Sequence, residues 1–277
     1  MALKFLRDVP AVLGLAIVLF GLVVAVFATE LAPHPEAAFQ SNLLQRFKPP
    51  SAEFWFGTDN LGRDIFSRVV LGTRSAFVIA LTVVGSAMLI GVPLGLLAGY
   101  LRDWRSEVIM RVTDVILAVP QLILALALAQ LMKPGLDTAM LALTLTYWPF
   151  FTRTVYAETR RLKNALFVEA LQGIGASTGR ILFLHILPNA ASPIIVRATI
   201  GMGFTILTAA VLGFLGVGAT PPDPDWGLAI AESRKFLPET WWFATFPGLA
   251  IFIAVLGFNL LGDGLRDLVD PRLRRSR

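Results

Sequence analysis

Six long stretches without Asp, Glu, Lys or Arg constrain what this 277-residue chain can fold into. They are residues 9–29, 75–101, 115–132, 138–152, 198–222 and 240–262. A helix needs about 20 apolar residues to cross the roughly 30 Å hydrocarbon layer of a bilayer, and five stretches reach or approach that length. The fourth is shorter, and we expect it to continue past Arg153, because an arginine near a helix end can extend its charge to the membrane surface. The sequence therefore predicts an all-α membrane protein with six spans.

The composition agrees with a membrane protein and excludes several other classes. Hydrophobic residues make up 56% of the chain and charged residues 16%, against about 25% charged in a soluble domain. The absence of cysteine excludes disulfides, zinc–thiolate sites and iron–sulfur clusters. The only histidines, His34 and His185, are far apart, which argues against a histidine metal site. The net charge of +5 does not predict nucleic-acid binding, because Lys and Arg of membrane proteins collect on the cytoplasmic side.

The distribution of Lys and Arg predicts an orientation. Lys4 and Arg7 precede a first apolar stretch that is too long for the core of a signal peptide, and no A-x-A cleavage site follows, so we expect this helix to be retained. If the N-terminus is cytoplasmic, fifteen Lys and Arg residues lie on the cytoplasmic side and eight on the other, with Arg197 inside a span. This bias predicts that both termini are cytoplasmic.

The predicted organisation has three parts. Residues 1–72 hold the first span and an external segment, residues 73–263 hold the other five spans, and residues 264–277 form a basic cytoplasmic tail. The five spans are placed at about 75–101, 110–132, 137–157, 191–217 and 241–263. We expect a short helix on the membrane surface before the second span, capped by Asp59, because the apolar residues that follow have helical spacing: Ile65, Phe66, Val69 and Val70. A further stretch, Gly227–Phe236, is expected to be re-entrant.

Residues 158–189 are too polar to span the membrane and too regular for a simple linker. Lys163–Gln172 is predicted to be a helix that ends at Gly173 or Gly175, since glycine readily adopts the positive φ found at helix ends. Ser177 or Thr178 is predicted to cap a second helix that runs to about Leu187, and Pro188 is predicted to break the chain before the fifth span. The segment is thus expected to be a helix–turn–helix on the cytoplasmic face.

The sequence of this hairpin resembles a known motif. Residues 169–188 read E-A-L-Q-G-I-G-A-S-T-G-R-I-L-F-L-H-I-L-P, which is similar to the EAA loop of ABC importer permeases. Leu171 stands where the second alanine is usual. Two further segments, F-G-T-D-N-L-G-R-D-I-F-S-R at 56–68 and the stretch from L-G-F-L-G-V-G at 212 to D-P-R-L-R at 270–274, resemble the C-type subunit of the dipeptide/oligopeptide/nickel permeases. The resemblance covers about residues 54–274.

The resemblance implies a type I ABC importer permease fold with six transmembrane helices and a cytoplasmic EAA coupling hairpin. It implies a subunit of the bacterial inner membrane that forms half of the translocation pathway for di- or oligopeptides, or for a related solute such as a nickel complex. The implied partners are a second, homologous permease that completes a heterodimer, two cytoplasmic ATPase subunits and an extracytoplasmic solute-binding protein. The substrate itself does not follow from the sequence.

Two groups of candidate site residues follow from the motifs. The residues implied in ATPase coupling are Glu169, Ala170, Gly173, Gly175, Ala176, Ser177, His185, Leu187 and Pro188. The alternative is that this segment is only a solvated surface hairpin. The second group, expected to brace the outer gate or to contact the binding protein, consists of Gly57, Thr58, Asp59, Gly62, Arg63 and Asp64. Its alternative is local: Thr58 and Asp59 cap a helix, while Arg63 and Asp64 face water.

Motifs for nucleotide binding and hydrolysis are absent from the sequence. There is no G-x-x-x-x-G-K-[ST], so the chain is not expected to bind ATP phosphates, and ATP and Mg are assigned to partner ATPase subunits. No common hydrolase motif occurs, so no catalytic residue is predicted and the chain is not expected to be an enzyme itself. The competing hypotheses are a self-sufficient secondary transporter or channel, for which inverted repeats and paired intramembrane charges would be typical, and an intramembrane enzyme.

A few polar residues and prolines of the spans remain without an assigned role. Arg197 is expected either to extend to the inner interface or to lie near the translocation path, and Asn259 either to bond a neighbouring helix or to line the path. Four prolines lie in or beside spans, where they are either hinges or ordinary residues of membrane helices: Pro93, Pro120, Pro149 and Pro247.

Overall fold

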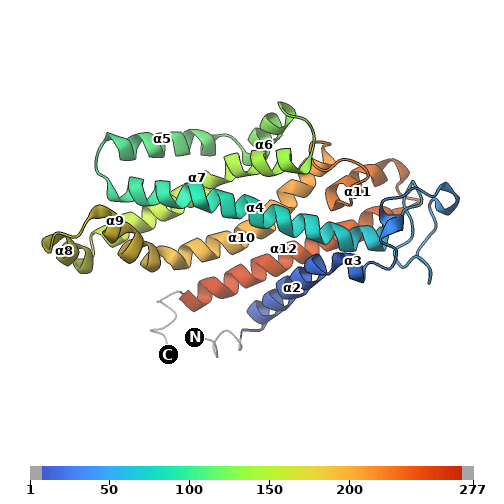
Figure 1. The fold of residues 1–277 in the computed structure, drawn as a ribbon, viewed down its shortest axis with the longest axis horizontal. Helices are drawn as coiled ribbons and strands as arrows, with labels where there is room; N and C mark the ends of the chain where they lie inside the picture. Colours follow the sequence, from blue (N-terminus) through green and yellow to red (C-terminus); the bar gives the residue numbers. More distant parts are fainter. Residues whose placement is uncertain (1–7, 270–277) are drawn as a thin grey trace.

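The computed structural model describes residues 8–269, which form an elongated helical bundle without β-strands in that range (Figure 1). Lys4, Arg7 and most of the predicted basic tail lie outside the described residues. The longer helices are α2 (Val9–Val26), α4 (Ile65–Tyr100), α5 (Trp104–Ala118), α6 (Gln121–Gln130), α7 (Leu136–Lys163), α10 (Leu187–Phe214) and α12 (Trp241–Val269). The short ones are α3 (Ala28–Leu31), η1 (Glu36–Ala38), η2 (Leu43–Gln45), α8 (Leu166–Gly173), α9 (Thr178–Arg180), η3 (Ile181–Ile186), α11 (Trp226–Ser233) and η4 (Arg234–Phe236).

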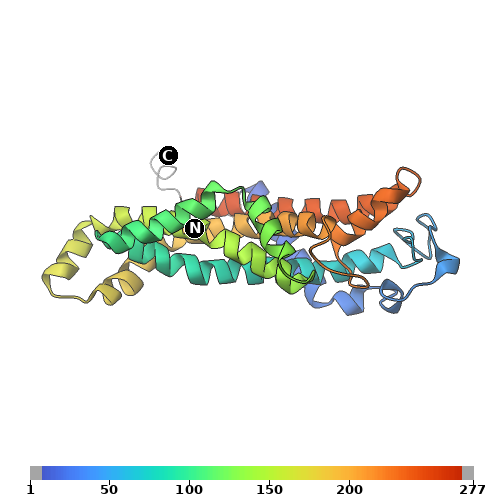
Figure 2. The ribbon, with the colours of Figure 1, turned by 90° about the horizontal axis from the view of Figure 1, so that it is seen from above.

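The two ends of the bundle differ. At one end, the turn and short helices between α7 and α10 project beyond the other helices in both views (Figures 1 and 2). We call residues 164–186 the hairpin and this end the hairpin end. At the opposite end lie the connection 32–64 and the segment that contains α11 and η4 (Figure 1). Helix α2 begins and α12 ends on the hairpin side of the bundle (Figure 1).

Four helical segments of the described residues are long and apolar enough to cross a membrane: α2, α4, the continuous helix Thr178–Phe214, and α12. The pair α5 and α6 makes a fifth if it is counted as one span, although it bends by 88° at its break. Helix α7 is the remaining long helix; it has 28 residues but does not pass the same test of apolar composition. Its polar and charged residues explain this, among them Asp137, Arg153 and Glu158.

Close packing of α4 against α7 forms the centre of the bundle. Gly91, Gly95 and Gly99 lie four residues apart on one face of α4, and each meets α7 directly. A Cβ added at Gly91 would lie 2.5 Å from the Trp148 carbonyl oxygen, and one at Gly95 would lie 2.7 Å from that of Thr152. The Thr152 hydroxyl also donates to the Gly91 carbonyl at 3.2 Å. Small residues at this spacing allow two membrane helices to approach at backbone distance.

The second layer is α12, which packs between α10 and α2. Glycines permit this contact from both sides. A Cβ at Gly14 of α2 would lie 2.4 Å from the Leu261 nitrogen, and one at Gly257 of α12 would lie 2.5 Å from Ile17. Large apolar side chains face outward from these helices; Phe20, Ile195 and Phe252 are 71%, 51% and 61% exposed. Such an apolar outer surface is suited to lipid.

Three sequence-based boundaries are wrong. The expected surface helix is not separate, because α4 starts at Ile65 and continues through the span, and its N-cap is Asp64 instead of Asp59. The third predicted span is not one straight helix, since Pro120 begins α6 after the 88° bend. Pro188 does not break the chain: a π-helical turn at Ile181–Ile186 carries the helix into α10, where Pro188 is in the first turn. Proline has no N–H to donate to the preceding turn, and the π-helical turn directly before it is a local departure from α-helical bonding at that point.

Replacing Gly95 with alanine should separate α4 from α7. The added methyl group would collide with a backbone carbonyl, which cannot move aside, and overpacking of this kind costs about 1–3 kcal/mol. Gly85 lies in the same helix with nothing within 4 Å of the position that an alanine methyl group would take, so Gly85→Ala should be neutral or stabilising, since alanine favours helices. Thermal unfolding of the purified chain in detergent measures the stability of both variants. Equal shifts in Tm would contradict the close approach of α4 and α7.

Candidate functional sites at the two ends of the bundle

The hairpin is attached to the bundle by buried apolar side chains. Val168 of α8 is fully buried, and Ile181, Leu182 and Ile186 are buried in the same cluster as residues of α4, α7 and α10. Leu166 and Ile174, on the outer side, are 83% and 80% exposed. The hairpin is therefore held firmly on its inner side and presents apolar groups on its outer side.

The turn of the hairpin is a Schellman motif. The Gly175 N–H donates to the Gln172 carbonyl at 3.0 Å, and the Ala176 N–H donates to the Leu171 carbonyl at 3.0 Å. Gly175 has φ = +75°, the left-handed conformation that this motif requires and that glycine adopts without strain. After the turn, the Ser177 hydroxyl accepts from the Arg180 N–H at 3.4 Å, so Ser177 is the N-cap of α9.

Most residues of the predicted coupling group lie on the accessible part of the hairpin. Glu169, Ala170, Gly173, Gly175, Ser177 and Pro188 are exposed, whereas Ala176, His185 and Leu187 are partly buried. Gly173 is the last residue of α8 and, unlike Gly175, does not have a positive φ. Within residues 8–269 the Glu169 carboxylate forms no ion pair. It is free to accept a charge-assisted hydrogen bond from another chain.

At the opposite end, a buried ionic network forms around Arg63. Its Nε donates to Asp59 Oδ2 at 2.6 Å, and its Nη2 donates to Glu232 Oε2 of α11 at 2.7 Å. The side chains of Arg63 and Asp59 are 1% and 0% exposed. Asp59 Oδ1 also accepts from the backbone N–H of Leu61 and of Arg63 itself. Buried charges are tolerated only when they are paired and hydrogen-bonded, and here both conditions are met.

Arg68 extends this network to the segment before α11. Its guanidinium donates to the carbonyl oxygens of Ala38, Pro222 and Asp223 at 2.6–3.2 Å. Burial raises the pKa of Asp225, although its carboxylate accepts from the Leu228 N–H as the N-cap of α11.

Glycine and threonine shape the backbone around this network. Gly62 has φ = +75°, and a Cβ there would lie 1.9 Å from the Asn42 carbonyl oxygen, so only glycine fits. Gly57 packs against the Trp242 indole, whose Nε1 donates to the Thr58 carbonyl at 3.3 Å. The Thr58 hydroxyl donates to the Gln45 carbonyl. We call the group of Thr58, Asp59, Arg63, Arg68 and Glu232 the Arg63 network.

The local alternative for this motif is wrong. Arg63 and Asp64 are each 1% exposed instead of facing water, and Asp59 binds Arg63 instead of capping a helix. The motif gives no indication of Glu232 as a partner of Arg63, because the two residues are 169 positions apart. No role is predicted for the glycines at 91, 95 and 99, although their four-residue spacing is visible in the sequence.

The remaining polar candidates lie along the bundle. The Arg197 guanidinium carbon is 4.7 Å from the Phe150 ring centroid and 5.8 Å from that of Tyr147, so it packs over aromatic rings of α7. Its Nε is buried without a hydrogen-bond partner in the described chain. Asn259 is partly buried in α12. Pro93, Pro149 and Pro247 lie inside α4, α7 and α12, whereas Pro120 lies at the bend between α5 and α6.

Two family models match the chain. One, described as binding-protein-dependent transport system inner membrane component, matches residues 91–275. The other, the N-terminal TM domain of oligopeptide transport permease C, matches residues 1–50.

Curated relatives match over nearly the whole chain. The dipeptide transport system permease protein DppC of Alkalihalophilus pseudofirmus is 43% identical over 95% of this chain and 86% of its own length. The probable D,D-dipeptide transport system permease protein DdpC of Escherichia coli K12 is 41% identical, over 92% and 85%. The glutathione transport system permease protein GsiD of Pectobacterium atrosepticum is 42% identical, over 98% and 90%.

Solved structures show the same fold. A chain of the MetNI methionine ABC transporter, in an inward-facing conformation, superposes with a TM-score of 0.62 over 74% of this chain and 98% of its own. The sequences are 20% identical, so this likeness concerns the fold alone. It confirms the predicted type I importer permease architecture.

Removing the charge of Arg63 should strongly destabilise the protein. Arg63→Met leaves Asp59 buried without its partner, and breaking a buried ion pair on one side typically costs about 3–5 kcal/mol. Arg111→Met is the control, because its pair with Glu107 is 78% and 69% exposed and such pairs contribute about 0–1 kcal/mol. Thermal unfolding followed by tryptophan fluorescence reports the difference, since Trp242 contacts the network. A small Tm shift in Arg63→Met, comparable with the control, would show that the network does not hold this end together.

Proposed function

Because the chain belongs to the family of binding-protein-dependent transport system inner membrane components, and is a permease subunit of an ABC importer, we propose that it forms half of a translocation pathway for short peptides. Support for the substrate class comes from the relatives, whose names specify dipeptides, D,D-dipeptides, di- and tripeptides and glutathione. The other half is a second, homologous permease, and an extracytoplasmic solute-binding protein delivers the peptide.

The observation that carries the coupling role is the form of the hairpin. It projects beyond the bundle (Figure 1). Its exposed residues include Leu166, Ile174 and Glu169, and the Glu169 carboxylate forms no ion pair within residues 8–269. Apolar anchors beside a single charged group are typical of the centre of a protein–protein contact. We assign this surface to a groove on one of two cytoplasmic ATPase subunits, which supply the ATP and Mg site that this sequence lacks.

The hairpin is also built to pass a movement on to the spans. Its inner side is buried against α7 and α10, and its second half, Thr178–Ile186, continues without a break into α10. A displacement of the hairpin must therefore move these two helices, because packed interiors deform little. Closure of the ATPase subunits would in this way change the angle of α10 at the translocation pathway.

The orientation follows from the coupling role. If the hairpin meets cytoplasmic ATPases, the hairpin end is cytoplasmic, and the beginning of α2 and the end of α12 lie on that side (Figure 1). The excess of Lys and Arg independently favours both termini inside. The Arg63 network then lies on the extracytoplasmic side, where we propose that it braces α11 against α4 below the docked binding protein.

Gly175→Ala should lower the ATP hydrolysis that loaded binding protein stimulates, without preventing membrane insertion. A side chain at φ = +75° costs about 1–2 kcal/mol, which corresponds to a roughly tenfold lower population of the native turn. Gly179→Ala is the matched control, because Gly179 is in the same hairpin, has open space around it and lacks a positive φ. The measurement is ATP hydrolysis by the reconstituted importer with loaded binding protein. Identical activities for the two variants would remove the turn from the coupling mechanism.

Glu169→Gln should lower the same activity and weaken co-purification of the ATPase subunits. Glu107→Gln, a loss of one exposed carboxylate elsewhere, serves as its control.

Peptide uptake into liposomes tests the proposal as a whole. Uptake should require the second permease, the ATPase subunits, the binding protein and ATP. Full uptake by this chain alone would instead establish a self-sufficient transporter and overturn the proposal.

A further inference from the structure

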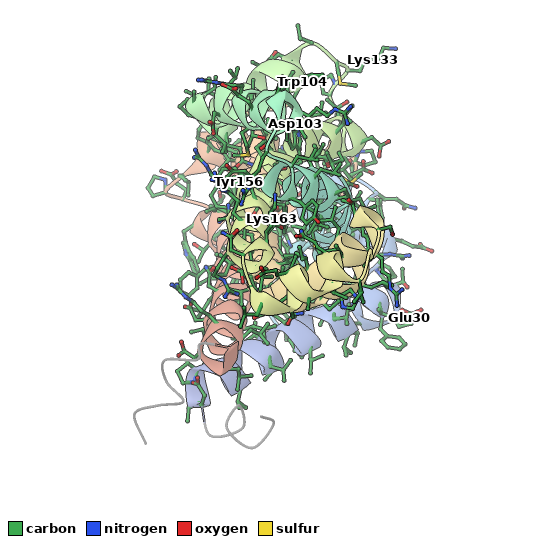
Figure 3. All side chains as sticks on the ribbon, turned by 90° about the vertical axis from the view of Figure 1, so that its left-hand side faces the viewer. Glu30, Asp103, Trp104, Lys133, Tyr156 and Lys163 are labelled. Atoms are coloured by element: carbon green, nitrogen blue, oxygen red, sulfur yellow. The ribbon has the colours of Figure 1, made fainter. Side chains whose placement is uncertain are left out.

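A cavity of about 450 Å³ lies near the hairpin end, between the end of α4, the first half of α5 and the end of α7. Viewed from the hairpin end, Asp103, Tyr156 and Lys163 of its lining lie between α5 and the hairpin (Figure 3). The cavity is lined mainly by polar and charged side chains, and the proposed coupling and peptide transport assign it no role.

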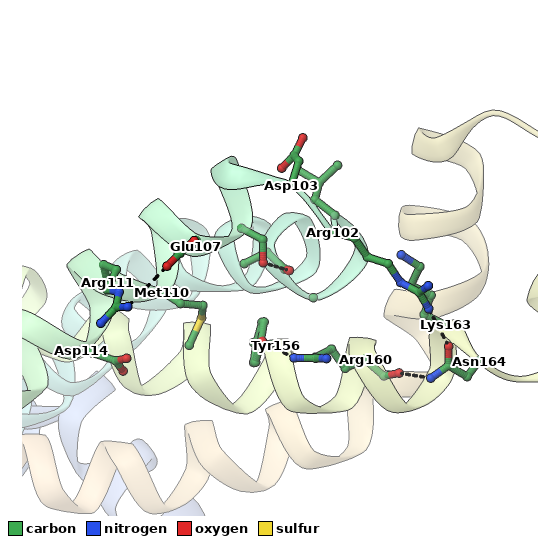
Figure 4. Close-up of a pocket in the computed structure, with 14 residues that line it drawn as sticks. Arg102, Asp103, Glu107, Met110, Arg111, Asp114, Tyr156, Arg160, Lys163 and Asn164 are labelled. Carbon is green, nitrogen blue, oxygen red and sulfur yellow. Dashed lines mark hydrogen bonds and ion pairs between the residues drawn. The ribbon is translucent and has the colours of Figure 1, made fainter.

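Three cations gather at one end of this cavity. Arg102 and Lys163 lie together next to Asn164, while Arg160, one turn earlier on α7, extends toward Tyr156 (Figure 4). Their hydrogen-bond partners are neutral. Arg102 donates to Asn164 Oδ1 at 3.4 Å, Arg160 donates to the Tyr156 hydroxyl at 2.7 Å, and Lys163 donates to the backbone carbonyl of Tyr100. No carboxylate of residues 8–269 lies within ion-pair distance of any of the three.

The acidic residues that line the cavity are engaged elsewhere. Glu107 pairs with Arg111 at 3.4 Å, at the other end of the cavity (Figure 4). Asp114 pairs with Arg153 at 2.9 Å. Asp103 is the N-cap of α5 and accepts from the Arg105 N–H at 3.0 Å. The cation end is thus left with an uncompensated positive charge.

The charge state of Lys163 reflects this crowding. Burial, followed by the charges of Arg102 and Arg160, lowers the pKa of the Lys163 ammonium, which lies beyond the predicted span 137–157. An anion placed among the three cations would offset their repulsion and raise the pKa of Lys163 again. The positions of the three cations and the lowered pKa of Lys163 therefore both favour an anionic ligand.

An apolar strip runs beside the cavity on α5. Trp104, Val108, Val112 and Val115 are 69%, 50%, 48% and 68% exposed. At 100° per residue they occupy the face of α5 next to the one that lines the cavity. Exposed tryptophan beside aliphatic residues is typical of the boundary between headgroups and hydrocarbon. A ligand with an anionic head and apolar chains would use both surfaces at once.

We infer that this cavity binds the phosphate of an anionic phospholipid headgroup among Arg102, Arg160 and Lys163, with the acyl chains along the apolar strip of α5. Free inorganic phosphate has the same anionic group as the lipid headgroup, but it has no acyl chains to contact the apolar strip of α5. Basic pockets between helices on the cytoplasmic side are a recurring way to bind such lipids. The bound lipid would neutralise the cations and fill the space between α5 and α7.

Native mass spectrometry of the assembled importer tests this inference. The importer is released from bilayers that contain phosphatidylglycerol and phosphatidylcholine with the same acyl chains, and the retained lipids are compared. The wild type should retain phosphatidylglycerol preferentially. In the variant R102Q/R160Q, the ratio of retained phosphatidylglycerol to retained phosphatidylcholine should fall by about tenfold, since each basic residue near an anionic headgroup contributes substantially to binding. The control R105Q/R161Q also removes two charges, one from α5 and one from α7, at residues that do not line the cavity, and should keep the preference.

Three results would overturn the inference. The first is an equal retention of both lipids by the wild type, and the second is an equal loss in the variant and the control. The third comes from a parallel arm in detergent: if inorganic phosphate raises the Tm of the importer as much as phosphatidylglycerol does, and the rise needs Arg102 and Arg160, the ligand is a soluble phosphate and not a lipid. None of these measurements depends on peptide transport.

Discussion

The close approach of α4 and α7 is the contact on which the rest of the structure depends. In a bilayer there is no hydrophobic gain from bringing two apolar helices together, so packing and hydrogen bonds must hold them. Gly91, Gly95 and Gly99 remove the side chains that would keep the backbones apart, and Thr152 adds a hydrogen bond across the contact. This pairing places the end of α7 against the end of α4, and both ends line the cavity that contains Lys163.

Helix α10 connects the two ends of the molecule. With α9 and the π turn it forms one helix from Thr178 to Phe214, about 55 Å long at 1.5 Å per residue. Its first part carries the hairpin, and near its other end α11 lies against it so closely that a Cβ at Gly227 would meet the Ala210 carbonyl at 2.2 Å. Glu232 of α11 in turn binds Arg63. A tilt of α10 at the hairpin end therefore reaches the Arg63 network through rigid, closely packed elements, which suits alternating access.

The charged residues divide by environment. The Arg63 network is distant from the hairpin, and its Arg63 and Asp59 charges are buried and paired, so these charges serve to join segments of the chain. The cations at Arg102, Arg160 and Lys163 are near the hairpin end and lack anionic partners in the described residues. A buried charge with an ion-pair partner is neutralised within the chain. A cluster of cations without such partners is neutralised only when an anionic ligand binds.

The sequence by itself determined the membrane class, the order of the spans, the hairpin and the glycine that turns it, because these depend on local composition and spacing. The hydrophobic stretches need no tertiary contact to be recognised, and Gly175 occupies the position that a helix-ending motif requires. Only the tertiary structure decided that Asp59 and Arg63 are buried with Glu232, that Pro188 lies within a continuous helix, and that α5 and α6 meet at a sharp bend. Each of these depends on what a distant segment places beside the residue, and neither hydropathy nor helix-capping rules contain that information.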